Sequence, residues 1–166
     1  MDKQGWRFIN DEELKKRSSE DDVQYGTVDH INNASRIREI YFKANPDYAA
    51  RFTVPVLWDT KEQTIVNNES AEILRIFNTG FNTILPKEYA EIDIYPEADQ
   101  ANIDELNGWI YDNINNGVYK AGFATKEEPY VKEVTNVFNH LDKLENLLKE
   151  NDASGKKFLL GNTLTE

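Results

Sequence analysis

The sequence predicts an α/β segment followed by an all-α segment. Two short apolar stretches, residues 52–58 and 64–66, flank a polar turn and lead directly into a helix start, which is typical of a β-hairpin followed by a helix. From residue 99 onward the apolar residues recur at helical spacing instead. The predicted fold class is therefore α/β plus all-α.

The stretch between these two segments has the composition of a linker. It contains Gly80, Pro86 and Pro96 and lacks a long apolar pattern. We therefore expect a first domain at residues 1–79, a linker at residues 80–98 and a second domain at residues 99–166.

The composition argues against several classes of function. A net charge of −11 disfavours binding to nucleic acid or to an anionic membrane, because both would repel the chain. No apolar run reaches the roughly 20 residues of a membrane-spanning helix, and the first residues lack the apolar core of a signal peptide. The absence of cysteine excludes disulfides, thiolate metal sites and thiol catalysis by this chain itself. Two histidines, His30 and His140, argue against a histidine metal centre or a Ser-His-Asp triad.

The first 50 residues are mostly polar. The charged run at residues 11–22 is expected to be a solvated loop or a frayed helix. Residues 37–42, IREIYF, have the pattern of a short helix that Asn45-Pro46 would end. Trp6 and Phe8 stand out as two aromatic residues in a hydrophilic start.

Residues 52–58 are predicted to form a buried strand although Pro55 lies within it. Proline cannot donate to a strand ladder, so it belongs at an edge, a bulge or a special turn. A cis Val54–Pro55 peptide bond and a proline at a sheet edge explain this position equally well. In the cis case the Val54 backbone would face outward and pair with an extended peptide, as a neighbouring strand does.

Residues 67–70, Asn-Asn-Glu-Ser, are predicted to open a helix that ends before Thr79. The free N–H groups and partial positive charge of such a helix start suit a carboxylate ligand. The Ser70 hydroxyl would donate to that carboxylate, and Glu69 would accept from an ammonium group. Taken alone, however, a plain helix cap explains Ser70 fully and Glu69 in part.

Two amphipathic stripes predict two long helices in the second domain. The first helix is expected within residues 101–119, with a stop near Asn115-Asn116-Gly117. The second is expected between Pro129 and residues 151–155. Core packing explains both stripes. Their members are Ile103, Leu106, Ile110 and Ile114 in the first helix, and Val134, Val137, Phe138, Leu141, Leu144 and Leu148 in the second.

Several motifs together resemble the glutathionyl-hydroquinone reductases, also called xi-class glutathione transferases, which are omega-like. These motifs are VPVLWD and NNES in the first domain, NNGVYKAGFA in the second, and the terminal GNTLTE. The resemblance covers nearly the whole chain and is firmest over residues 51–79 and 101–124. It implies a partial thioredoxin-like domain, made of a β-hairpin and a helix, followed by part of an all-helical glutathione-transferase C-terminal domain.

The resemblance also implies a glutathione site on the first domain. The Val54 backbone would pair with the cysteinyl unit of glutathione, and Glu69 and Ser70 would hold its γ-glutamyl end. Trp6 would stack over the peptide, and Arg51 would lie near its glycine end.

On the second domain the resemblance implies a pocket for the quinol. Tyr119, together with Tyr111, would point into that pocket, where a phenol donates a proton or a hydrogen bond to the aromatic oxygen. Without the resemblance, these tyrosines and Trp109 are better explained as half-buried helix aromatics with a hydrated hydroxyl.

The sequence departs from this family in one respect that concerns the chemistry. The family's nucleophile is a cysteine in a Cys-Pro-Trp motif after the first strand, and this chain has no cysteine. That motif is expected to precede Trp6, and the chain ends at Glu166, inside an expected helix-capping box. We therefore expect the sequence to be a piece of a longer reading frame, inactive by itself.

The family resemblance implies a cytoplasmic homodimer that acts on glutathione and on quinol-type aromatic conjugates, with neither a nucleic acid nor a membrane as partner. The alternative expectation is a non-catalytic module of the glutathione-transferase type, used for binding or assembly.

Overall fold

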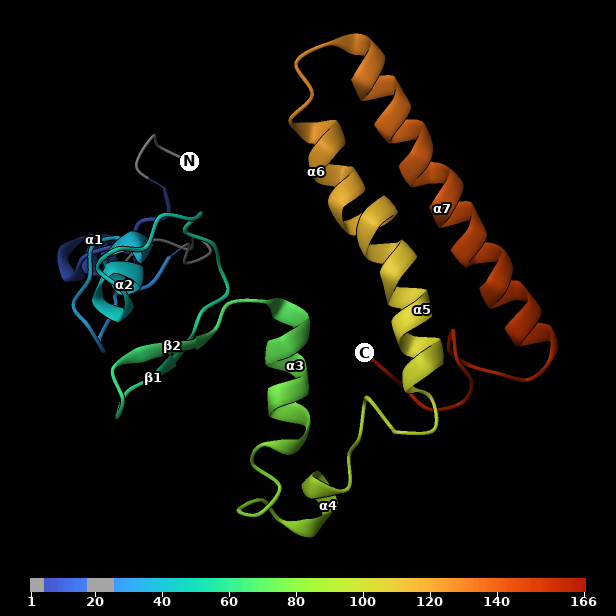
Figure 1. Ribbon diagram of the computed structural model, residues 1–166, viewed down its shortest axis with the longest axis horizontal. Helices are drawn as coiled ribbons and strands as arrows, with labels where there is room; N and C mark the ends of the chain where they lie inside the picture. The colour runs from blue at the N-terminus through green and yellow to red at the C-terminus, as the bar shows by residue number, and fades with distance from the viewer. Residues whose placement is uncertain (1–4, 18–25) are drawn as a thin grey trace. The chain divides into compact units, whose positions relative to one another are not determined.

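The computed structural model describes residues 5–17 and 26–166, which divide into two compact units (Figure 1). Unit 1 is Met1–Leu74 and unit 2 is Arg75–Glu166. Unit 1 contains the helices α1 (Asp11–Arg17) and α2 (Ile37–Ala44), the strands β1 (Leu57–Asp59) and β2 (Thr64–Asn67), and the start of helix α3 (Ser70–Thr79). Unit 2 contains the end of α3, then α4 (Lys87–Ala90), α5 (Gln100–Ile110), the π-helical turn η1 (Tyr111–Asn115), α6 (Asn116–Gly122) and α7 (Glu127–Ala153). A small sheet with helices, followed by helices alone, confirms the predicted fold class.

The core of unit 1 forms around α2. Ile37, Ile40 and Tyr41 are its buried residues, and Tyr41 is only 2% exposed. The Tyr41 ring lies 4.7 Å from the Tyr48 ring and 5.6 Å from the Phe52 ring, measured between centroids. Aromatic pairs of this kind add about 0.5–1.5 kcal/mol beyond the area that they bury. The predicted helix at residues 37–42 is therefore confirmed, and it supplies the centre of this core.

The charged run near the N-terminus forms the helix α1 over Asp11–Arg17. A reciprocal capping box begins this helix: the Glu13 N–H donates to Asn10 Oδ1 at 2.8 Å, and the Asn10 N–H donates to Glu13 Oε2 at 3.0 Å. The remainder of the run, residues 18–22, lies outside the described residues.

The predicted hairpin is present, but its first strand is shorter than expected. β1 pairs with β2 in antiparallel register, with Trp58 opposite Ile65. Residues 52–56 do not join the ladder, so the prediction of a strand over residues 52–58 is wrong for that part. Pro55 has no N–H to donate, and side chains rather than a neighbouring strand bind the polar atoms of Thr53. The peptide bond between Val54 and Pro55 is cis, one of the two alternatives that the sequence left open.

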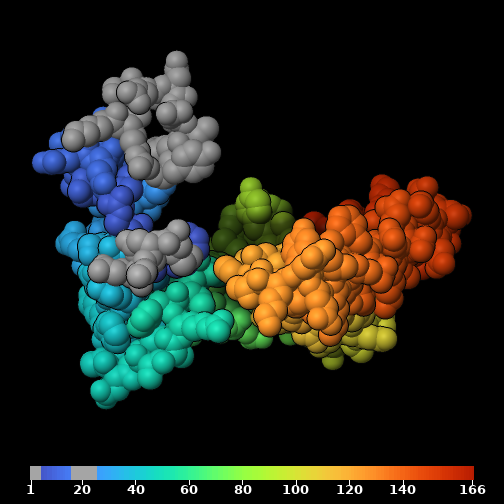
Figure 2. Space-filling model, turned by 90° about the horizontal axis from the view of Figure 1, so that it is seen from above, coloured from blue at the N-terminus to red at the C-terminus, as the bar shows by residue number. Residues whose placement is uncertain are grey.

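In unit 2, α5, η1 and α6 form one continuous helical rod that runs alongside α7 (Figure 1). Figure 2 shows the atoms of α6 and α7, in orange and red, as one continuous mass. The predicted helix end at Asn115-Asn116-Gly117 is wrong, because the rod continues to Gly122. Gly117 is buried at the contact with α7, where an added Cβ would lie 2.7 Å from Val137 Cγ2. Close packing against α7 therefore outweighs the weak helix propensity of this stretch.

The second long helix also differs from its prediction. Pro129 lies inside the first turn of α7, not before it, because the N–H groups of a first turn need no partner within the helix. Val137 is buried, but Phe138, Leu141 and Leu148 are 61%, 40% and 40% exposed. The expectation that the whole stripe is core is thus wrong for these three residues. The stripe on α5 is confirmed at Ile103, which is 0% exposed.

Within the described residues, no helix is both long enough and apolar enough to cross a membrane.

Replacing Gly117 with alanine tests the close approach of α6 and α7. Because the new methyl group would meet Val137 at 2.7 Å, we expect Gly117→Ala to lower the free energy of unfolding by about 1–3 kcal/mol. The measurement is denaturant unfolding followed by far-ultraviolet circular dichroism.

Gly108→Ala is the matched control, since Gly108 lies on α5 and an added Cβ there meets nothing within 4 Å. That variant is expected to gain about 0.5–1 kcal/mol, the usual difference between glycine and alanine within a helix. Equal effects of the two substitutions would contradict the packing that we describe.

Candidate functional site

The segment around Val54 presents an unpaired backbone. The Val54 side chain is 45% exposed, and the residue lies in a bend that precedes β1. Within the part of the chain that the structure describes, no hydrogen bond engages the backbone N–H or C=O of Val54. These groups are available to an extended peptide, which would pair with them as a strand does.

The start of α3 presents a second set of polar groups. Glu69 precedes the first helical residue, Ser70, and its carbonyl accepts the Ile73 N–H at 2.9 Å. The Glu69 N–H in turn donates to Asn67 Oδ1 at 2.8 Å. Glu69 thus occupies the capping position, and Ser70 is not a cap. Both side chains are exposed, and neither has a hydrogen bond among the described residues.

Three side chains join these two sets. The Tyr41 hydroxyl donates to the Thr53 carbonyl oxygen at 2.9 Å. The Asn68 side-chain amide donates to Thr53 Oγ1 at 3.0 Å and to the Tyr41 hydroxyl oxygen at 3.1 Å. Thr53 immediately precedes Val54, and Asn68 immediately precedes Glu69. The Val54 backbone and the start of α3 are therefore brought side by side.

This connection was not predicted from the sequence. The sequence pattern predicts Asn68 only as part of a helix start and Tyr41 only as part of a helix. Their contacts span 27 residues of the chain. The sequence offers only a weak signal for it, a second asparagine directly after Asn67 at the helix start.

Arg51 and Trp6 lie on the same unit with fewer connections. The Tyr48 hydroxyl donates to the Arg51 carbonyl at 2.9 Å, which fixes the chain just before Thr53, while the Arg51 side chain is exposed. Trp6 is 48% exposed, and its carbonyl accepts the Ile37 N–H at 3.2 Å. Among the described residues, no hydrogen bond or ring contact joins Trp6 to Val54 or Glu69.

The two predicted pocket tyrosines belong to unit 2. Tyr111 begins η1 and is 53% exposed, and Tyr119 lies on α6 and is 64% exposed. The Tyr119 ring stacks on the Phe123 ring with 6.3 Å between centroids. The π-helical turn lies between the two tyrosines, and such turns frequently occur at functional sites.

A charged cluster on unit 2 has a structural role. The Arg75 guanidinium lies 3.7 Å from the centroid of the Tyr95 ring, donates to Asp104 Oδ1 at 2.7 Å and pairs with the Glu166 carboxylate. The Tyr95 hydroxyl, and then Arg75, hold the pKa of Asp104 below its usual value by donating to it. These contacts tie α3 to α5 and to the C-terminal segment.

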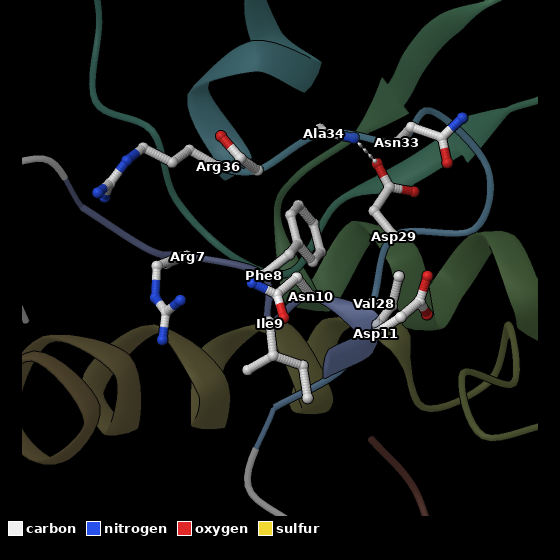
Figure 3. Close-up of a pocket in the computed structure, with 11 residues that line it drawn as sticks. Arg7, Phe8, Ile9, Asn10, Asp11, Val28, Asp29, Asn33, Ala34 and Arg36 are labelled. Carbon is white, nitrogen blue, oxygen red and sulfur yellow. Dashed lines mark hydrogen bonds between the residues drawn. The ribbon is translucent and has the colours of Figure 1, made fainter. Parts of the chain in front are cut away.

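A hollow of about 290 Å³ lies elsewhere on unit 1. Figure 3 shows Arg7 and Arg36 on one side of it and the carboxylates of Asp11 and Asp29 on the other. None of the predicted site residues lines this hollow. Of these charged residues, Arg7 pairs with Glu13 at 2.9 Å.

Asp29 organises the loop that borders this hollow. Its Oδ1 accepts the N–H groups of Ile31 and Asn32, both at 3.0 Å, and its Oδ2 accepts the Ala34 N–H at 3.1 Å. Burial acts to raise the pKa of Asp29, but these backbone donors outweigh it and hold the pKa below its usual value. The described residues contain no group of three or more side chains that would hold a metal ion.

No protein-family model matches the chain. Among curated proteins, it is 48% identical over 167 residues to glutathione S-transferase omega-like 2 of Schizosaccharomyces pombe, covering 100% of this chain and 49% of that protein. It is 46% identical over 162 residues to glutathionyl-hydroquinone reductase YqjG of Escherichia coli, covering 98% of this chain and 44% of that protein.

Solved structures agree with this relationship. The glutathione-bound structure of YqjG matches with a TM-score of 0.81 at 45% identity, covering 98% of this chain and 46% of that one. The xi glutathione transferase ECM4 of Saccharomyces cerevisiae, in complex with glutathione, matches with a TM-score of 0.85 at 38% identity, covering 99% and 57%. The chain is homologous to the xi-class glutathione transferases.

The chain spans about half the length of the curated relatives that it matches. Both residue sets of the candidate site, at Val54 and at Glu69-Ser70, lie within the aligned chain. The homology thus supports the predicted family, and the arrangement of these residues supplies the geometry on which a functional proposal can rest.

Replacing Asp29 with asparagine tests the loop beside the hollow. An amide nitrogen would face one of the three N–H donors, so we expect Asp29→Asn to destabilise the chain by about 1–3 kcal/mol at neutral pH. Because the native pKa is lowered, this stabilisation is present above the ordinary pKa of about 3.9 and is lost as the pH falls through the lower native value.

The measurement is denaturant unfolding of the wild type and the variant between neutral pH and pH values below that ordinary pKa. Asp47→Asn is the control, since the Asp47 carboxylate has no hydrogen bond within the described residues. A difference between Asp29→Asn and the wild type that stays constant with pH would be inconsistent with this role.

Proposed function

We propose that this chain carries the glutathione-holding residues and part of the quinol pocket of a glutathionyl-hydroquinone reductase. The observation that carries the proposal is the joining of two unpaired sets of polar groups, the Val54 backbone and the start of α3, through Thr53 and Asn68. One set suits an extended peptide and the other suits the end of an amino acid. Glutathione has both features.

Each part of glutathione has a partner in this arrangement. The cysteinyl unit pairs with the N–H and C=O of Val54. The γ-glutamyl carboxylate binds the free N–H groups at the start of α3, where the helix dipole favours negative charge, and accepts from the Ser70 hydroxyl. The Glu69 carboxylate accepts from the ammonium group in a charge-assisted hydrogen bond. Trp6 covers the peptide, and Arg51 lies toward its glycine carboxylate.

The proposed reaction transfers glutathione from carbon to sulfur. A cysteine thiolate attacks the glutathione sulfur of the conjugate, the sulfur–carbon bond breaks, and the aromatic carbon takes a proton as the hydroquinone leaves. A second glutathione thiolate then attacks the mixed disulfide and releases oxidised glutathione. Tyr119, with Tyr111 beside it in the pocket, donates a proton or hydrogen bond to the aromatic oxygen.

This chain contains no cysteine, so the thiolate in this scheme comes from outside these 166 residues. The parent protein of the proposal is a cytoplasmic homodimer whose partners are glutathione and quinol-type aromatic conjugates. The absence of cysteine also favours a second candidate, a non-catalytic module that binds glutathione without transferring it. An in-frame Cys-Pro-Trp codon run upstream of Met1 would distinguish the enzyme from that module.

Removing the Glu69 carboxylate tests the glutathione site. Since Glu69 would lose a charge-assisted hydrogen bond to the ammonium group, Glu69→Gln is expected to weaken glutathione binding about 10- to 100-fold. The measurement is isothermal titration calorimetry with reduced glutathione.

Glu72→Gln is the matched control, because Glu72 lies in the same first turn of α3 and carries the same charge. That variant is expected to bind within about twofold of the wild type. A Glu69→Gln variant with unchanged affinity would remove Glu69 from the site.

Assaying turnover separates the binding site from the chemistry. The 166-residue chain should bind glutathione but release no hydroquinone from a glutathionyl-hydroquinone, because it supplies no thiolate. Product formation followed by chromatography checks this. Steady release of hydroquinone faster than glutathione alone releases it, without the protein, would refute the assignment of the nucleophile to a cysteine outside the chain.

A further inference from the structure

We propose that Tyr41, Thr53 and Asn68 are positioning residues, which hold the two halves of the glutathione site at a fixed separation. This proposal rests on the function proposed above and adds residues that do not themselves touch the ligand. Each of the three lies directly beside a binding residue in the sequence or is anchored in the core of unit 1.

The geometry of the three side chains forms a closed set of hydrogen bonds. The Tyr41 hydroxyl donates to the Thr53 carbonyl at 2.9 Å and lies 3.2 Å from Thr53 Oγ1. The Asn68 amide donates to both partners, at 3.1 Å to Tyr41 and 3.0 Å to Thr53. One amide group therefore bridges the residue before Val54 and the core tyrosine.

The core fixes one corner of this set. Tyr41 is 2% exposed, and its ring packs against Tyr48 and Phe52. Its hydroxyl consequently has little freedom to move. Hydrogen bonds to this fixed hydroxyl therefore restrain the chain at Thr53 and Asn68. A binding residue needs to be held within about 0.5 Å of its productive place, which neighbouring hydrogen bonds achieve.

Within the described residues, no pairing with a neighbouring strand fixes the backbone at Val54. Residues 52–56 lie outside the sheet, and the ladder begins at Leu57. The hydrogen bonds of Thr53 thus replace the ladder bonds that would otherwise fix an extended segment. At the other half, Asn67 caps the Glu69 N–H, which leaves the Asn68 amide free to reach Thr53 and Tyr41.

The loss of this connection should raise the cost of ordering the site when the ligand binds. We expect Thr53→Val, which keeps the shape of the side chain but removes its hydroxyl, to weaken glutathione binding about tenfold. Asn68→Ala is expected to weaken it at least as much, since it removes two hydrogen bonds. Thr53→Ser restores the hydroxyl and should bind within about twofold of the wild type.

A matched control lies in unit 2. The Asn151 side-chain amide also donates two hydrogen bonds, to the Phe158 and Leu159 carbonyls, both at 2.8 Å. Asn151→Ala therefore removes the same chemistry from a place that holds no proposed binding residue. Its affinity for glutathione should equal that of the wild type, although its stability falls.

The experiment is isothermal titration calorimetry of reduced glutathione into the full chain and these four variants, at a temperature where circular dichroism shows each of them folded. Weak binding by Thr53→Val with recovery in Thr53→Ser supports the proposal. Wild-type binding with equal affinities for Thr53→Val, Asn68→Ala and the wild type would overturn the positioning role and leave the proposed function standing. Absence of wild-type binding would overturn the proposed function and this proposal with it.

If Asn68→Ala does not fold, the comparison of Thr53→Val with Thr53→Ser decides alone. Valine carries two methyl groups and no hydroxyl, whereas serine carries the hydroxyl and no methyl group, and Thr53→Val leaves the hydrogen bond from Tyr41 to the Thr53 carbonyl intact. Equal weakening in both would contradict a role for the hydroxyl.

Discussion

The Tyr41 hydroxyl is the group on which the arrangement of unit 1 depends. Its ring is buried in the core that α2 forms, and its oxygen reaches both Thr53 and Asn68. The segment that carries Val54 has no ladder partner, and the start of α3 leaves the sheet at the same end of the hairpin, since Leu57 lies opposite Asn67. The apolar core fixes the Tyr41 ring, and the hydrogen bonds of its hydroxyl fix the polar groups next to it. A binding site for a small peptide requires polar groups held in place in this way.

The homology and the geometry support each other without duplicating each other. Similarity to xi-class glutathione transferases, some of them solved with glutathione, shows the kind of protein to which this chain is related. The structure adds which side chains connect the proposed halves of the site. In the proposal the binding groups and the nucleophile are separate, because the chain contains no cysteine. The tyrosines of the proposed quinol pocket lie on unit 2, and their role in such a pocket stays a prediction.

Local sequence patterns predicted what local forces decide. The helix at Ile37–Ala44, the hairpin and the start of α3 follow from apolar spacing and capping residues, and they are confirmed. Contacts between distant residues decided the rest. The amide of Asn68 finds Tyr41 across 27 residues, which no local pattern encodes. The helix continues through Gly117 because α6 packs closely against Val137 of α7 at this residue. This packing overrides the helix end that local propensity predicts.

The most direct test of the account is a nuclear magnetic resonance titration of the isotopically labelled chain with reduced glutathione. The amide signals of Val54, Glu69 and Ser70 should move and saturate together with one dissociation constant, while those of α7 stay in place. The cysteine-free composition ensures that no mixed disulfide contributes to these shifts. Signals that do not move at any of the three residues, or that move only at residues 100–153, would contradict a glutathione site at the start of α3.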